Sequence, residues 1–437
     1  MLLSLIFGVI GLAVLIGIAW AFSADRRNVN WRLVATGLLL QIVFALIVLV
    51  VPYGKTVFDW ISQGFVLVLG FTREGAGFIF GPLMDVQNLG FIFAFQVLPT
   101  IIFFSSLMAV LYHLRIMQKV VELMARAITK VMPVSGAESL GVCANVFVGQ
   151  TEAPLVVRPY IAGMTQSELL ALMIGGMATI AGGVLAAYVG MLGGGNPELE
   201  AYYAKHLLSA SIMAAPATLL IAKILCPEKE LPATLGEVKI NVEIPSANVI
   251  DAAASGAGDG LRLALNVGAM LLAFIALIAM VNWPLTAIGG WDWFGLFGEG
   301  ASLNGLVDSI YGKPVGLSIQ SLLGIVLAPI ALLIGVPWQD TLQVGSLIGQ
   351  KVVLNEFVAY SELVKTQAEL SDKGRLIATY ALCGFANFSS IAIQIGGIGG
   401  LAPDRRGDLA RFGLRAVLGG SLATFMTATI AGVLGSL

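Results

Sequence analysis

Eight long apolar stretches constrain this chain more than any other feature of its sequence. About 20 apolar residues in a helix cross the hydrocarbon core of a bilayer. The rest of the composition agrees, since 58% of the residues are hydrophobic and only 11% are charged. We therefore predict an all-α, multi-pass protein of the lipid bilayer, with eight transmembrane helices. The stretches lie near residues 2–22, 33–53, 89–113, 166–191, 206–226, 261–283, 376–400 and 412–435.

Charge and cysteine content argue against several other classes. A net charge of −2 gives no basis for nucleic acid as a partner. Cys143, Cys226 and Cys383 lie in apolar stretches without a Cys/His cluster, so buried thiols are a better interpretation than a disulfide or a metal site. Residues 1–22 lack a basic start, and a second apolar stretch follows, so we expect a retained span rather than a signal peptide.

The distribution of basic residues predicts the orientation. If the N-terminus is outside, the inside connections hold 14 Lys and Arg residues and the outside connections hold 7. Cytoplasmic loops carry the excess of basic residues in membrane proteins. We therefore expect both termini outside. The inside connections are then 23–32, 114–135, 223–262 and 402–411.

Two further stretches fit neither a span nor an ordinary loop. Residues 137–163 and 341–365 are moderately apolar, and each is interrupted midway, the first at 149–154 and the second at Asn355-Glu356. A helical arm over 137–148 is roughly 18 Å long, which is less than the hydrocarbon core of about 30 Å. Non-helical backbone at that depth is tolerated only inside protein or beside a wet cavity. We expect two re-entrant helical hairpins with polar tips.

The order of these elements occurs twice. Residues 89–226 and residues 261–437 each contain, in this order, a span, an amphipathic segment, a hairpin and two further spans. Each copy crosses three times, so the copies have opposite orientation. Such inverted repeats with interrupted helices indicate a secondary transporter with a site at the membrane midplane. Residues 1–88, with spans 1 and 2 and an interfacial segment, precede the first repeat, and a cytoplasmic connection, 227–260, joins the two.

A short motif supports the repeat. Residues 176–182 and 384–390 both read Gly-x-Ala-(Thr/Asn)-x-small-small. The match is short, and chance could produce it alone, but the matched order of the elements argues against chance.

Glu152 and Glu356 are the most informative polar residues. Each lies at a predicted hairpin tip, and an ionisable group at membrane depth is usually functional. The alternative is a structural carboxylate that caps the second helix of each hairpin. Asn387 interrupts an apolar span, where helix packing explains a small residue but not an amide that needs several partners.

Three segments resemble the concentrative nucleoside transporter family. They are 149–155, 355–360 and 383–391, and their order and spacing are similar to those of bacterial members with eight spans. The resemblance runs from about residue 72 to the C-terminus. It implies a homotrimer in a bacterial inner (plasma) membrane, where the termini expected outside from the basic residues would be periplasmic. It also implies symport of a nucleoside of the uridine, cytidine and adenosine class with a cation.

The resemblance implies a role for each site residue. The nucleobase would contact the first hairpin and span 4, and the ribose would contact the second hairpin and span 7. Physical chemistry agrees, because an ionised carboxylate accepts hydrogen bonds from both hydroxyls of a ribose diol. The nucleobase residues would be Gln150, Thr151, Glu152 and Val184, the ribose residues Glu356, Asn387 and Ser390, and Phe385 would line the same pocket.

The coupling ion implied by the resemblance is sodium, with no other cofactor. Asn145 and Thr179 would bind it through their side chains, and Val148 and Ile180 through backbone carbonyls. Oxygen ligands of this kind suit a hard cation. The alternative is proton coupling, with Glu152 titrating in the same region.

Two other classes of protein fit this sequence less well than a carrier. An enzyme could use the two glutamates as an acid–base pair, but no nucleophile, histidine or metal set accompanies them. A channel needs a continuous polar pore, whereas the polar residues here gather at one depth. We therefore predict a transporter rather than an enzyme.

Overall fold

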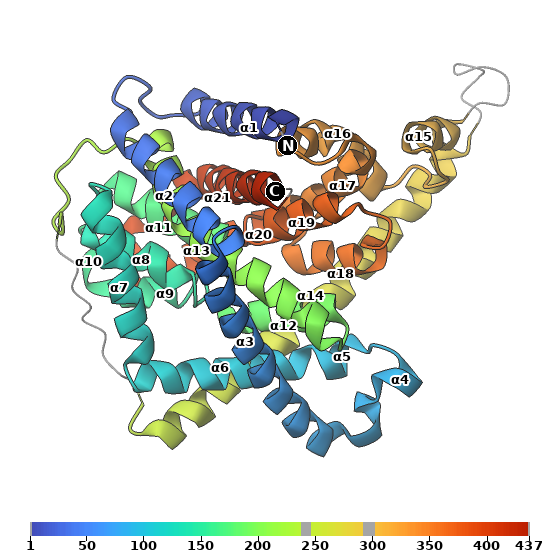
Figure 1. Ribbon diagram of the computed structural model, residues 1–437, viewed down its shortest axis with the longest axis horizontal. Helices are drawn as coiled ribbons and strands as arrows, with labels where there is room; N and C mark the ends of the chain where they lie inside the picture. Colours follow the sequence, from blue (N-terminus) through green and yellow to red (C-terminus); the bar gives the residue numbers. More distant parts are fainter. Residues whose placement is uncertain (1, 237–245, 292–301, 436–437) are drawn as a thin grey trace.

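The computed structural model describes residues 2–236, 246–291 and 302–435, and these ranges fold into helices joined by turns and loops (Figure 1). The predicted all-α class is confirmed. Within these ranges the only β-type pairing is an isolated bridge between Ser135 and Leu235. The middle of the predicted connection 227–260 and the last two residues lie outside the described ranges.

Eight helical segments in the described ranges are long and apolar enough to cross a bilayer. Seven of them correspond to predicted spans. They are α1 (Leu2–Ala21, span 1), α2 (Trp31–Leu49, span 2), α5 with α6 (Phe93–Gln96 and Leu98–His113, span 3), α11 with α12 (Gln166–Ala178 and Gly182–Gly193, span 4), α13 (Pro197–Leu225, span 5), α14 (Val249–Gly289, span 6) and α21 (Arg406–Leu434, span 8).

The eighth segment begins with α3 (Pro52–Phe80), within the stretch predicted to be interfacial. Its length and hydropathy meet the criterion for a span. It also carries four charged residues along its length, which suits a helix at a membrane surface. The interfacial placement stays a prediction. The charged residues are Lys55, Asp59, Arg73 and Glu74.

The predicted span 376–400 is not one helix, and like span 4 it is interrupted. The chain forms α19 (Asp372–Leu382) and α20 (Phe388–Leu401), separated by a five-residue loop. The Asn387 side chain caps α20 by accepting a hydrogen bond from the Ser390 amide at 2.9 Å. The Phe385 amide donates to the Thr179 carbonyl at 3.3 Å, which ties this loop to the corresponding break between α11 and α12.

Both predicted interruptions are present as turns between helices. The first hairpin comprises α8 (Gly136–Asn145), a turn, α9 (Ala153–Val156) and α10 (Arg158–Ile161). The second comprises α17 (Thr341–Val353) and α18 (Glu356–Thr366). Their depth in a membrane stays a prediction.

Shorter elements connect these parts. The amphipathic α7 (Ile116–Val131) buries one face, formed by residues three or four positions apart, as a surface helix does. The others are η1 (Gly81–Met84), α4 (Val86–Leu89), α15 (Leu303–Tyr311), α16 (Ile319–Leu333), η2 (Trp338–Asp340) and η3 (Pro403–Arg405).

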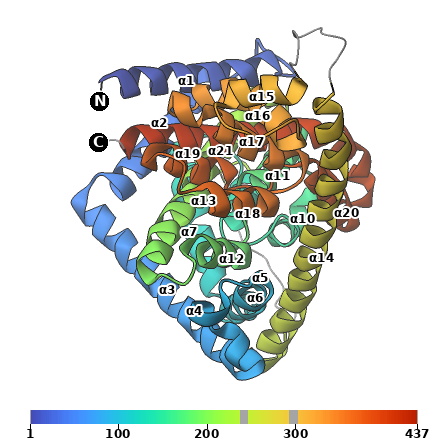
Figure 2. The ribbon, with the colours of Figure 1, turned by 90° about the vertical axis from the view of Figure 1, so that its right-hand side faces the viewer.

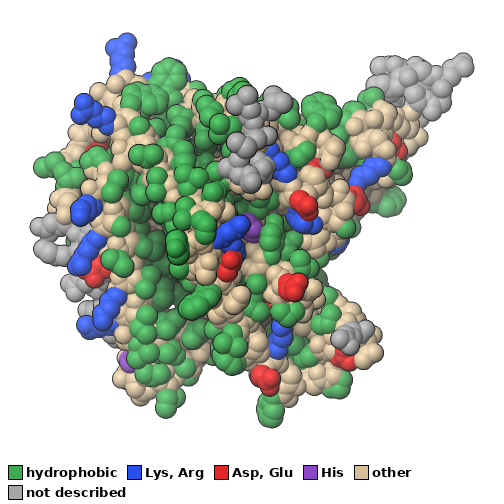
Figure 3. Space-filling model, in the orientation of Figure 1, with side chains coloured by type: hydrophobic (Ala, Val, Ile, Leu, Met, Phe, Trp, Pro, Cys, Tyr) green, Lys and Arg blue, Asp and Glu red, His purple; other side chains and the backbone are tan. Residues whose placement is uncertain are grey.

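The helices form a buried centre and an exposed periphery. In α11–α12 and in α13, 89% of the residues in the most apolar part of the helix are buried inside the protein. In α14 only 22% are buried. Figure 2 shows α14 along one side of the molecule and α3 along the other, with α13, α18 and α21 between them. Hydrophobic side chains cover much of the face in Figure 3, as expected for a surface in contact with lipid.

Candidate functional site

Glu356 lies at the start of α18, where the second hairpin meets span 7. Its side chain is only 4% exposed. The Asn387 Nδ2 atom donates to Glu356 Oε2 at 2.9 Å, and the Tyr188 hydroxyl donates to Oε1 at 3.3 Å. Both carboxylate oxygens therefore have a donor, as a buried charge requires. Each oxygen keeps a lone pair that could accept from a ligand hydroxyl.

The capping interpretation of the two glutamates fails. The cap of α18 is Asn355, whose side chain accepts a hydrogen bond from the Val358 amide at 3.0 Å. Glu152 precedes α9 but makes no side-chain cap bond. Asn387 does cap its helix through its oxygen, and its nitrogen is thereby aimed at Glu356.

A second set of polar contacts joins the first hairpin to span 7. Gln150 donates to the Ser390 hydroxyl at 3.0 Å, and Gln394 donates to the Gln150 oxygen at 3.1 Å. Gln150 fits here because its neighbour is glycine: a Cβ added at Gly176 would lie 2.8 Å from the Gln150 Cβ. Two residues of span 7 therefore contact the two hairpin tips. Asn387 contacts Glu356 of the second tip, and Ser390, three positions later, contacts Gln150 of the first.

The other predicted substrate residues are arranged differently. Val184 is buried in α12, and Phe385 is partly buried in the loop before α20. Thr151 and Glu152 are exposed at the first tip and lie outside the hydrogen-bonded network. The structure therefore joins Gln150, Glu356, Asn387 and Ser390 in a network, and leaves Thr151 and Glu152 at its open side.

Sequence analysis missed two residues of this network. Tyr188 packs its ring against Phe357 and Tyr360, with ring centroids 4.8 and 4.3 Å apart, and this fixes its hydroxyl on Glu356. Gln394 is completely buried and also donates to the Met173 carbonyl at 2.9 Å. An amide within an apolar span was a usable signal for Gln394. A tyrosine in such a span was not.

The four predicted sodium ligands lie where the first hairpin meets the break in span 4. The Thr179 hydroxyl donates to the Asn145 carbonyl at 2.7 Å and lies 2.9 Å from the Gly175 carbonyl. The Asn145 Oδ1 atom is buried without a hydrogen-bond partner in the described part of the chain. The Val148 and Ile180 carbonyls accept no backbone hydrogen bond from the described residues.

Orphaned buried acceptors are costly, and a cation is the natural partner for several of them together. The donor set is all oxygen, which suits sodium. The predicted ligands therefore fit such an ion chemically.

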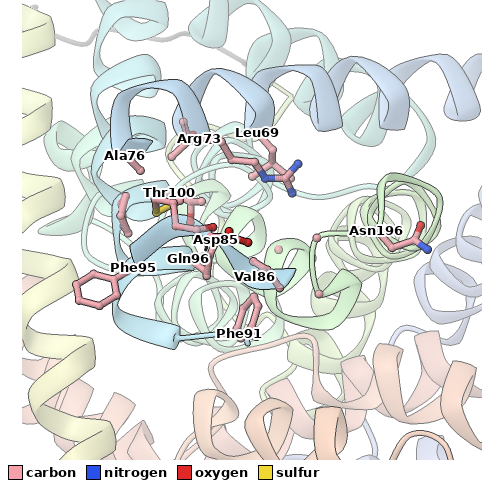
Figure 4. Close-up of a pocket in the computed structure, with 16 residues that line it drawn as sticks. Leu69, Arg73, Ala76, Asp85, Val86, Phe91, Phe95, Gln96, Thr100 and Asn196 are labelled. Atoms are coloured by element: carbon pink, nitrogen blue, oxygen red, sulfur yellow. Dashed lines mark hydrogen bonds between the residues drawn. The ribbon is translucent and has the colours of Figure 1, made fainter. Parts of the chain in front are cut away.

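A cavity in the described part of the chain lies away from these residues. It has a volume of about 590 Å³ and lies between α3, the α4–α6 region and the end of α12 (Figure 4). Neither it nor a second cavity of about 460 Å³ is lined by Glu356 or its partners. The candidate site is therefore identified by the buried, hydrogen-bonded polar residues at the hairpin tips and not by the volume of a cavity.

Three family models match the chain. "Na+ dependent nucleoside transporter N-terminus" matches residues 10–83, "Nucleoside recognition" matches 94–195, and "Na+ dependent nucleoside transporter C-terminus" matches 206–432.

Similar proteins agree with these matches. Nucleoside permease NupC of Helicobacter pylori is 40% identical over 443 residues, which cover 99% of this chain and 98% of the permease. The uncharacterized transporter YutK of Bacillus subtilis is 48% identical over 99% of this chain and 100% of its own length. Sodium/nucleoside cotransporter 1 of Mus musculus is 38% identical over 97% of this chain and 63% of its own.

Solved structures match over nearly the whole chain. CNTnw in an inward-facing, substrate-bound state is 45% identical, with a TM-score of 0.85 and coverage of 99% of this chain and 98% of that one. A CNTnw variant in an intermediate state has a TM-score of 0.88 at 46% identity and covers 99% of both chains.

The fold and these matches define a membrane transporter, not an enzyme. The chain belongs to the concentrative nucleoside transporter family.

Proposed function

We propose that this protein is a sodium-coupled symporter that imports nucleosides of the uridine, cytidine and adenosine class. The observation that carries the proposal is the Glu356–Asn387 pair, set beside Ser390 and Gln150. A ribose diol presents two adjacent donors, which a buried carboxylate with free lone pairs accepts in charge-assisted bonds. Gln150 offers an amide donor and acceptor that match the edge of a nucleobase.

The nucleobase lies against the first hairpin in this proposal. Thr151 and Glu152 line its open side, Val184 packs against it, and Phe385 closes the pocket near the ribose. Since Gln150 and Ser390 are hydrogen-bonded to each other, the arriving nucleoside exchanges this contact for contacts of its own.

Sodium binds through Asn145, Val148, Thr179 and Ile180. The support is the Asn145 oxygen, which has no hydrogen-bond partner among the described residues, together with two carbonyls that accept no backbone hydrogen bond from them. An ion there ties the first hairpin to span 4 and shapes the adjacent nucleobase site. Sodium then raises the affinity for nucleoside, and nucleoside raises the affinity for sodium by the same factor.

The driving force is adequate with one sodium per nucleoside. One charge that crosses 100 mV supplies about 2.3 kcal/mol, and a tenfold gradient adds about 1.4 kcal/mol. The total of about 3.7 kcal/mol sustains roughly 500-fold accumulation.

The proposal places the protein in a bacterial inner membrane as a homotrimer, with both termini periplasmic. Each protomer exposes its site alternately to the two sides. The hairpins and spans 4 and 7 move together against spans 3 and 6.

Uptake of labelled uridine into proteoliposomes tests the proposal. A sodium gradient should drive accumulation, and a proton gradient alone should not. Counterflow, in which internal unlabelled uridine draws in labelled uridine, should be present because a carrier exchanges solute. Uptake that follows a pH gradient and ignores sodium would instead indicate a proton-coupled nucleoside symporter.

A further inference from the structure

Lys351 is a buried cation that the proposed function does not use. It lies in the last turn of α17, and its side chain has no exposed surface. In the described part of the chain it forms no salt bridge with a carboxylate. A buried charge without a paired ion is costly unless other groups compensate it.

The groups around the Lys351 ammonium resemble an ion's ligands. Its Nζ atom donates to the Ala381 carbonyl at 2.8 Å and to the Thr424 hydroxyl at 3.2 Å. The centroid of the Phe425 ring lies 6.0 Å away, within range of a cation–π contact. Ala381 is in the last turn of α19, where helix carbonyls lose their intrahelical partners and carry partial negative charge.

The half-helices of spans 4 and 7 start 206 residues apart, although the Gly-x-Ala motif within them is offset by 208. The span 4 half-helices begin at Gln166 and Gly182, and those of span 7 begin at Asp372 and Phe388. Both pairs of starting points are separated by 206 positions. The same offset pairs Asn145 with Lys351 and Gly175 with Ala381.

The contacts of these four residues follow the same register. In the first repeat Asn145 lies against Gly175, since a Cβ added at Gly175 would be 3.3 Å from the Asn145 Nδ2 atom. In the second repeat Lys351 contacts Ala381 directly. Asn145 and Lys351 therefore occupy equivalent positions. Each lies in the last turn of the first helix of its hairpin, α8 or α17, and contacts the last turn of the first half-helix of its span, α11 or α19.

We propose that the Lys351 ammonium is a built-in cation, which holds in the second repeat the place that the coupling sodium holds in the first. This inference rests on the sodium site of the proposed function. The first hairpin is joined to span 4 by an ion that binds and dissociates during transport. The second hairpin is joined to span 7 by a cation on a side chain, so Glu356 keeps its position without a second ion. One repeat exchanges its cation and the other does not, which explains a stoichiometry of one sodium per nucleoside.

The test converts Lys351 to the residue of the other repeat. Uridine binding to purified Lys351→Asn protein is measured across a sodium chloride series balanced with choline chloride. Wild-type protein should show a Hill coefficient for sodium of about 1, and Lys351→Asn should show a value that rises toward about 2. The variant should also need more sodium for the same uridine affinity.

Two further variants separate the charge from the fold. Lys351→Met has similar length but cannot ligate a cation, so sodium should not restore its uridine affinity. Lys365→Asn removes an exposed lysine from the same hairpin and should behave as wild type. Thermal unfolding in sodium and in choline provides a readout that does not need transport, and sodium should raise the midpoint of Lys351→Asn more than that of wild type.

The possible failures are distinguishable. A Lys351→Asn protein that binds uridine with wild-type affinity at low sodium and a Hill coefficient of about 1 overturns the inference. So does a variant that folds in neither salt, because sodium should replace the lost charge. Wild-type protein without sodium-dependent uridine binding contradicts the proposed function itself.

Discussion

At the scale of single residues, the Glu356 carboxylate carries the most testable chemistry. Glu356→Gln keeps the shape but removes the charge. A hydrogen bond to a charged group contributes about 1.5–3 kcal/mol, so uridine affinity should fall roughly 10- to 150-fold. Equilibrium binding to the purified protein measures this.

The matched control for Glu356→Gln lies on the same helix. Glu362 is partly exposed and pairs with Lys365, so Glu362→Gln should retain wild-type affinity. An unchanged affinity in Glu356→Gln would remove Glu356 from the ribose site. Free uracil should bind poorly to both proteins and to wild type, because it leaves the ribose contacts unmade.

The Thr179 hydroxyl permits an equally narrow test of the ion site. Thr179→Val keeps the shape and removes one proposed sodium ligand. We expect the sodium concentration for half-maximal uridine uptake to rise roughly tenfold or more, the equivalent of about 1.4 kcal/mol. Thr429→Val is the control, since among the described residues the hydroxyl of the buried Thr429 bonds within its own helix, at the Phe425 carbonyl. Equal sodium dependence in the two variants would contradict the assignment.

At the scale of elements, each hairpin is fastened to the span that follows it. Ser135 caps α8 and donates to Glu168, in the first turn of α11, at 2.5 Å. In the second repeat the Ser371 hydroxyl, which caps α19, donates to Asp340 at the start of the hairpin. Gly374 allows this approach, because a Cβ there would lie 2.2 Å from the Asp340 Oδ2 atom. The base of each hairpin should therefore move with its span.

Removing one such fastening should be costly. In Ser135→Ala, α8 loses its cap, worth about 1 kcal/mol. The buried Glu168 also loses a donor, worth about 1–3 kcal/mol. The free energy of unfolding should fall by about 2–4 kcal/mol, seen as a lower thermal midpoint in detergent. Ser302→Ala, which removes only the cap of α15, should lose about 1 kcal/mol. Equal losses in the two variants would argue against the contact between hairpin and span.

The sequence predicted the hairpins better than the broken spans, for a physical reason. The tips carry local signals: Asn355 caps a helix, and Pro154 suits the first turn of one. The break in span 7 depends on the Phe385–Thr179 backbone contact, whose partners are far apart in sequence. No local pattern reports such a contact, so the polar residues of span 7 were noted from the sequence but the five-residue loop was not predicted.

The candidate site shows the same division. Glu356, Asn387, Ser390 and Gln150 were predicted, and the structure joins them in one hydrogen-bonded network. Tyr188, the second donor to the Glu356 carboxylate, was missed because its position comes from ring contacts with two hairpin aromatics rather than from its own segment.

At the scale of the whole molecule, α6 and α14 form a closely packed pair. Glycines make this possible: a Cβ added at Gly260 would lie 2.7 Å from the Ile102 Cα atom. The α12 helix also packs against α6, but there a Cβ added at Gly183 makes only ordinary contact, 3.6 Å from the Ser105 Oγ atom. The tight interface suits a permanent scaffold, and the looser one suits a surface along which span 4 slides.

Cysteine crosslinking distinguishes these two interfaces. The background has its three native cysteines replaced, so that only engineered thiols react. A disulfide needs Cβ atoms about 3.5–4.5 Å apart. In Ser105→Cys with Gly183→Cys the engineered thiols are neighbours, because a Cβ at Gly183 would lie 3.6 Å from the Ser105 Oγ atom. Oxidation of this pair should stop uridine uptake, because it ties the moving span 4 to the scaffold, and a reductant should restore uptake. Ser106→Cys with Ala253→Cys joins the two scaffold helices where the Ser106 hydroxyl donates to the Ala253 carbonyl at 2.8 Å, and neither position is a glycine that the close packing requires. That crosslink should leave uptake intact. Uptake that survives the first crosslink would rule out motion of span 4 against span 3, and uptake abolished by the second would show that the α6–α14 pair is not a rigid scaffold.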